Sequence, residues 1–104
     1  MIFLLLNLLR VNPLILDTEL SIIAEHRAEI VSQDWSHTGW KESFRGTNCT
    51  YQAENLARDL TELEAVIKWL QSPTHRTIIL SDNYNTVGIG HYENITVNLF
   101  CHYE

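Results

Sequence analysis

A chain of 104 residues has room for one domain, and residues 1–104 are expected to fold as a single unit. Hydrophobic residues make up 45% of the chain and charged residues 19%, a composition that excludes an intrinsically disordered protein. The net charge of −6, with seven scattered Lys and Arg, argues against a nucleic-acid partner and against electrostatic docking on an anionic membrane.

The first predicted element is an apolar helix at the N-terminus. Ile2, Leu5, Leu6 and Leu9 follow the spacing of a helical core face. Much of the remaining surface of this helix is also apolar, through Phe3, Leu4, Leu8 and Val11. A helix that is apolar on nearly all sides is usually buried on nearly all sides. We therefore expect one face to pack on this domain and the other on a partner chain or a second copy.

The same segment matches neither a cleavable secretory signal nor a membrane span. It lacks a basic start and small residues before a cleavage site. Asn7 and Arg10 interrupt it well short of the roughly 20 apolar residues that a span needs.

A second helix is predicted after the break at Asn12-Pro13. Asp17 or Thr18 is the candidate cap, and the expected core face is Leu20, Ile23, Ala24, Arg27 or Ala28, and Val31. Residues 33–52 have no clean period and contain Trp35 and Trp40. A loop of this length within a small domain is typical of a functional segment.

Two further helices and two strands complete the prediction. Thr61 and Glu64 form a capping box, and the apolar stripe that follows it is Leu63, Val66, Ile67 and Leu70. Ser72 and Pro73 then start a short helix that runs through Leu80. Strands are predicted over residues 86–90 and 94–101, joined by a hairpin at residues 91–93. Helices followed by paired strands indicate an α+β fold.

The two cysteines are 52 positions apart, which excludes a CxxC motif. Two alternatives stay open for Cys49 and Cys101: a disulfide, which would indicate an oxidising compartment, or two independent buried thiols. Two N-x-T sequons, at Asn48 and Asn94, are compatible with secretion.

Five short segments in order carry a family resemblance: WSHTG, ENLA, WLQSPTHRTIIL, TVGIG and the closing NITVNLFCHY. With PLILDTELSIIAEHRA before them, they resemble a bacterial-type domain of the CAP superfamily (cysteine-rich secretory, antigen-five and pathogenesis-related proteins). The resemblance implies a three-layer α/β/α sandwich with a small antiparallel sheet. It also implies an extracellular or surface location, and a cysteine in the closing strand without naming its partner.

The resemblance also implies a cleft. His37 and His75 match the two cleft histidines of the family and Glu54 matches the glutamate of its Glu-Asn step, while Ser72 stands where eukaryotic members have a second glutamate. Two imidazoles and a carboxylate suit zinc. We expect Ser72 to bond a backbone N–H of the helix that it caps. Trp35 and Trp40 are candidates for a ligand-binding loop.

Three functions follow as hypotheses. The first is a non-catalytic binding module whose cleft takes a lipid or a glycan. The second is a structural subunit of a larger assembly that uses the apolar N-terminal helix. The third is a metal-assisted hydrolase that uses His37, Glu54 and His75.

Overall fold

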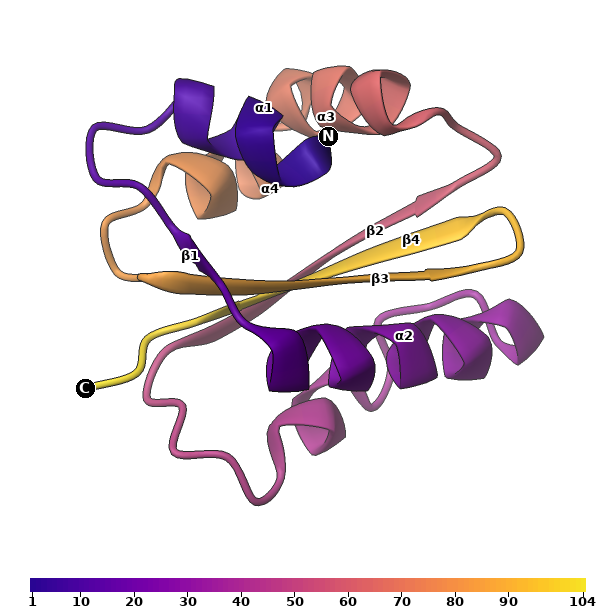
Figure 1. Ribbon diagram of the computed structural model, residues 1–104. Coiled ribbons are helices and arrows are strands. Elements are labelled where there is room, and N and C mark those ends of the chain that lie inside the picture. The colour runs from indigo at the N-terminus through magenta and orange to yellow at the C-terminus, as the bar shows by residue number, and fades with distance from the viewer.

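A four-stranded sheet separates two helical layers in the computed structural model, which describes residues 1–104. In Figure 1 the helices α1, α3 and α4 lie on one face of the sheet, and α2 lies on the other. The predicted α/β/α sandwich is therefore confirmed. In chain order the elements are α1 (Ile2–Leu8), β1 (Ile15–Leu16), α2 (Thr18–Gln33), the 3-10 helix η1 (Trp40–Phe44), β2 (Gln52–Arg58), α3 (Glu62–Gln71), α4 (Pro73–Leu80), β3 (Thr86–Tyr92) and β4 (Ile95–Cys101).

The strand order in the sheet is β1-β3-β4-β2. The predicted hairpin is present: β3 and β4 pair antiparallel up to Tyr92 opposite Ile95, with Glu93 at positive φ in the turn. β2 pairs antiparallel with the other side of β4. The two-residue β1 differs from the expected antiparallel sheet, because it pairs parallel with β3. At this edge the chain crosses from the α1 layer to the α2 layer in the direction in which β3 runs.

The second helix forms where the sequence predicts it. The Asp17 carboxylate accepts a hydrogen bond from the Leu20 amide at 2.7 Å, which caps the helix. The predicted face is buried except for Ile23, which is half-buried, and both Arg27 and Ala28 lie in it. α2 lies directly on β3 because Gly88 and Gly90 have no side chain there. A Cβ at either glycine would overlap backbone atoms of α2.

The predicted apolar stripe of α3 is partly wrong. The capping box at Thr61 is present, but Leu63 is 49% exposed and Ile67 is 44% exposed. Ala65, Val66 and Trp69 are the buried residues instead. The physical reason is the large indole of Trp69, which fills space in the core. Its Nε1–H donates to the Leu56 carbonyl at 2.9 Å, so the side of the helix that carries Trp69 faces the sheet.

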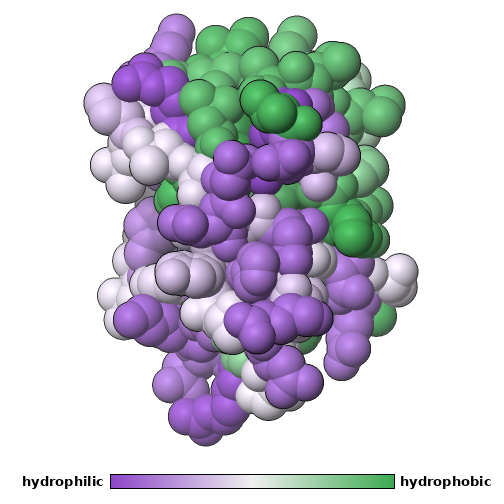
Figure 2. Space-filling model, turned by 90° about the vertical axis from the view of Figure 1, so that its left-hand side faces the viewer, coloured by the Kyte–Doolittle hydropathy of each residue, from purple (hydrophilic) through white to green (hydrophobic).

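The N-terminal helix buries one face only. Ile2 and Leu6 are buried in the core beneath α3, whereas Leu4 and Leu8 are 66% and 81% exposed. Figure 2 shows apolar side chains gathered over the α1 layer, in contrast to the polar lower half of the molecule. None of the helices combines the length and the apolar composition that crossing a bilayer requires.

A disulfide joins Cys49 to Cys101, with Cα atoms 5.6 Å apart. Of the two alternatives for the cysteines, the structure has the bridge. It ties the irregular segment before β2 to the last residue of β4. Asn48 and Asn94, the two sequon residues, lie outside the buried core.

Candidate functional site

A buried ion pair lies at the base of the candidate site. Glu54 is on β2, on the face opposite Ala53 and Asn55, so its side chain points into the α2 layer. There the Arg27 Nε lies 2.6 Å from Glu54 Oε2 and its Nη2 lies 3.1 Å from Oε1, with both side chains at most 2% exposed. Arg27 also donates to the carbonyls of Ser36 and Thr38 at 3.3 Å. The guanidinium therefore fixes both the carboxylate and the loop that carries His37.

His37 is the half-exposed member of this group. Its Nδ1 lies 3.0 Å from Glu54 Oε1, and its side chain is 52% exposed. Because a carboxylate only accepts hydrogen bonds, Nδ1 of His37 is the protonated ring nitrogen in this contact. Glu54 thus sets the tautomer of His37.

His75 approaches from the opposite side, on α4. Its ring centroid is 6.4 Å from that of His37, and its Nδ1 lies 2.8 Å from Ser72 Oγ. The expectation that Ser72 bonds a backbone N–H of α4 is wrong, because its hydroxyl bonds the imidazole and leaves the helix without a side-chain cap. Burial, and then the nearby His37, lower the pKa of His75 below its usual value.

The structure brings His37, Glu54 and His75 to one cleft of about 340 Å³. Trp40 lines this cleft, but Trp35 does not. The Arg58 guanidinium lies over the Trp35 ring, 4.5 Å from the ring centroid. Ser72 lies behind His75 and is not part of the lining. The other lining residues are Gln52, Ala53, Thr74, Ile78 and Tyr84.

Two residues that position the cleft, Arg27 and Arg10, were not assigned to it from the sequence. Arg27 falls within the expected core face of the second helix, and an arginine in an apolar stripe is itself a signal for a buried ion pair. Arg10 has no such signal. Its guanidinium donates to the carbonyls of Ile79, Ser81 and Tyr84 at 2.7–2.9 Å, which holds the segment between α4 and β3 and with it the Tyr84 wall of the cleft.

The three candidate ligands do not fit a zinc ion in this arrangement. No group of three or more His, Cys, Asp or Glu side chains is placed to hold a metal. Both oxygens of Glu54 already contact Arg27, and one of them also contacts His37. A carboxylate neutralised by a buried guanidinium is a poor metal ligand, so this set of side chains does not suit zinc.

The comparisons with known proteins agree with this architecture. The profile described as the cysteine-rich secretory protein family (CAP) matches residues 8–103. No curated protein matches the chain significantly.

Three solved structures share the fold. An extracellular protein containing an SCP domain, from Bacillus anthracis, is 21% identical with a TM-score of 0.92. An outer surface protein from Borrelia burgdorferi is 20% identical with a TM-score of 0.87, and a cysteine-rich secretory protein from Staphylococcus aureus is 17% identical with a TM-score of 0.86. Each alignment covers 98% of this chain, but only 39%, 90% and 37% of the respective neighbours, so the chain spans well under half of two of them. Because the family profile covers nearly all of its residues, the chain belongs to the cysteine-rich secretory protein (CAP) family.

Proposed function

We propose that this protein is a non-catalytic binding module whose cleft takes a polar, ring-shaped ligand such as a sugar unit of a glycan. The observation that carries the proposal is the state of Glu54. Its carboxylate is buried and both of its oxygens are engaged by Arg27, so it serves as a counter-ion rather than as a free general base for a substrate. The depressed pKa of His75 keeps that ring neutral, suited to hydrogen bonding.

The lining supports a glycan over a lipid chain. Trp40 and Tyr84 supply aromatic surface on which a sugar ring can stack, while Gln52, Thr74 and the histidines supply hydrogen-bonding groups. A lipid acyl chain would leave those polar groups without partners, which is unfavourable. We also propose an extracellular or surface location, supported by the disulfide and by the neighbours described as extracellular or outer-surface proteins.

The test is a screen of soluble oligosaccharides followed by NMR titration of the best one, with the His37 and His75 ring signals as reporters. Trp40→Ala should weaken binding at least about tenfold, as expected for a buried aromatic contact. The matched control is Trp35→Ala, which lies outside the cleft lining and should leave affinity unchanged. Equal loss in both variants, or no oligosaccharide binding, would contradict the glycan proposal.

The hydrolase alternative separates from binding in the same experiment. Turnover of the bound oligosaccharide that disappears on adding a chelator would favour a metal-assisted hydrolase. A binding module keeps its ligand in the presence of chelator and releases no product.

A second candidate function is that of a subunit in a larger assembly, which self-associates through α1. The observation in favour is the exposure of Leu4 and Leu8, because an apolar patch of this kind on a surface helix typically marks an interface. Leu4→Ser/Leu8→Ser should abolish concentration-dependent association in light scattering. Ile22→Ser/Ile30→Ser on α2 is the control, since these side chains are also exposed but lie on the other layer. A monomer at all concentrations before mutation would contradict self-association.

A further inference from the structure

The outer edge of β3 is only partly covered. β1 pairs with Thr86 and Val87 and then ends. Beyond it, the Ile89 amide donates to the Ser21 hydroxyl at 3.1 Å rather than to a strand. Because alternate residues of a strand present their backbone groups to the same edge, the Ile89 carbonyl and both backbone groups of His91 also face this edge. These groups form a short template for one more strand.

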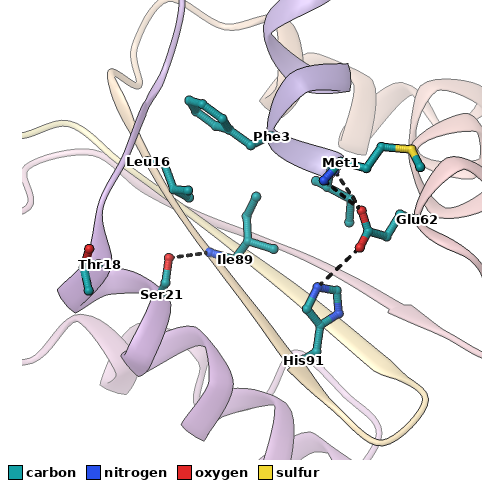
Figure 3. A pocket seen from close by; sticks show the side chains of 9 residues that line it. Met1, Phe3, Leu16, Thr18, Ser21, Glu62, Ile89 and His91 are labelled. Carbon is teal, nitrogen blue, oxygen red and sulfur yellow. Dashed lines mark hydrogen bonds and ion pairs between the residues drawn. The ribbon is translucent and has the colours of Figure 1, made fainter.

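Two hollows lie along this edge. The larger, of about 400 Å³, has apolar walls from Phe3, Leu16 and Ile89. Figure 3 shows the Ile89 side chain between Leu16 on one side and Glu62 and His91 on the other. The smaller, of about 270 Å³, reaches Ile22, Glu25 and Gly90 on the α2 side. Both hollows include Ile89 and His91, so they adjoin the same stretch of strand.

This pairing of hollows matches what an added strand requires. Successive side chains of a strand point to opposite faces of the sheet. A peptide paired with β3 would place one side chain in the α1-side hollow and its two neighbours toward the α2-side hollow. Backbone hydrogen bonds supply affinity in such complexes, and pockets for alternate side chains supply specificity.

The charge along the edge selects the occupant. Glu62 lines the larger hollow and Glu25 the smaller, and no Lys or Arg side chain lines either. The Met1 ammonium lies 3.3 Å from Glu62, which leaves Glu25 as the carboxylate available to a partner. A second copy of this chain would set acidic groups against their own equivalents, whereas a basic peptide would neutralise them. Three further carboxylates line the adjoining surface: Asp59, Glu64 and Glu93.

We propose that the outer edge of β3 is a docking site for an extended basic segment of a partner protein, which adds as a strand with an apolar side chain over Phe3, Leu16 and Ile89 and a Lys or Arg beside Glu25. This site shares no lining residue with the His37–His75 cleft, so it does not depend on the function proposed for that cleft.

The test uses the capped peptide acetyl-Thr-Lys-Val-Lys-Thr-amide and NMR titration of the folded protein. Amide signals of Ile89, Gly90 and His91 should shift, and hydrogen exchange at the His91 amide should slow. Two control peptides carry N-methyl groups, one on Val and the other on both Lys. In an extended peptide, the Val amide and the two Lys amides point to opposite edges, and only one edge pairs with β3. One control peptide should therefore lose binding and the other should keep it.

Protein variants test the charge argument. Glu25→Gln should weaken binding roughly two- to fivefold, the range of an exposed ion pair. Glu29→Gln, one turn further along the exposed side of α2, is the matched control and should bind as the unmodified protein does. The proposal is overturned if no β3 amide shifts at millimolar peptide, if both N-methylated peptides bind equally, or if the protein dimerises through this edge.

Discussion

Replacing Arg27 with methionine is expected to lower the free energy of unfolding by about 3–5 kcal/mol. The side chain is 2% exposed and its guanidinium contacts both oxygens of Glu54, which is 1% exposed. Methionine retains the apolar stem of the side chain but removes the charge. Glu54 would then be a buried carboxylate with only His37 as a polar partner, and a buried charge without its counter-ion is strongly destabilising.

Urea unfolding followed by fluorescence of the three tryptophans measures this loss. With a slope of about 1–1.5 kcal/mol per molar urea, the midpoint should fall by roughly 2–5 M. The control is Arg45→Met. Arg45 also lies 2.6 Å from a carboxylate, that of Glu42, but these side chains are 80% and 66% exposed. Removing that surface pair should change stability by less than about 1 kcal/mol, although the distance is the same.

The double variant Arg27→Met/Glu54→Leu separates the ion pair from packing. With both charges removed, the protein should be more stable than Arg27→Met alone, because no unpaired charge remains in the core. A loss below about 1 kcal/mol for Arg27→Met would refute the buried pair. A double variant less stable than the single one would refute the view that the unpaired carboxylate causes the loss.

Four further predictions concern the core, the disulfide and the cleft. Leu6→Ala should cost about 2–5 kcal/mol, whereas Leu63→Ala should cost under about 1 kcal/mol, as urea midpoints will show. Cys49→Ser opens a disulfide that spans 52 positions and should lower stability by about 4 kcal/mol in the same assay. Because the folded pKa of His75 lies below 6.5, the unfolded chain binds more protons as pH falls through that value, so stability should decrease there, and His75→Gln should flatten the decrease. Ser72→Glu should raise the pKa of His75 in an NMR titration, since it places a negative charge beside the ring.

Local signals in the sequence predicted much of the fold. Asp17 and Thr61 cap their helices as expected, because a cap depends on a few adjacent residues. The stripe of α2 is buried as expected apart from the half-buried Ile23, since its period is regular over the whole helix. The β3–β4 hairpin follows from alternation on either side of a short turn.

Features that depend on distant residues could not be predicted in the same way. α3 carries apolar residues on more than one side, and which side is buried depends on where the Trp69 indole fits against β2. β1 is only two residues long and forms because β3 is beside it. Thr96 and Asn98 share a strand face and are both buried although they are polar, because helices cover both sides of the central strand β4.

A family resemblance locates the cleft, but its chemistry comes from partners that no local motif specifies. His37 and His75 differ because Glu54 accepts from one ring, while the other meets a neutral hydroxyl from Ser72. With no negative charge beside His75, burial and the neighbouring His37 determine its pKa, and both lower it. Arg27 forms an ion pair with Glu54, the one carboxylate that lines the cleft. Ser72 meets His75 where eukaryotic relatives have an acid, and Arg27 occupies both oxygens of Glu54. These two contacts are the basis of our proposal that the cleft binds a ligand.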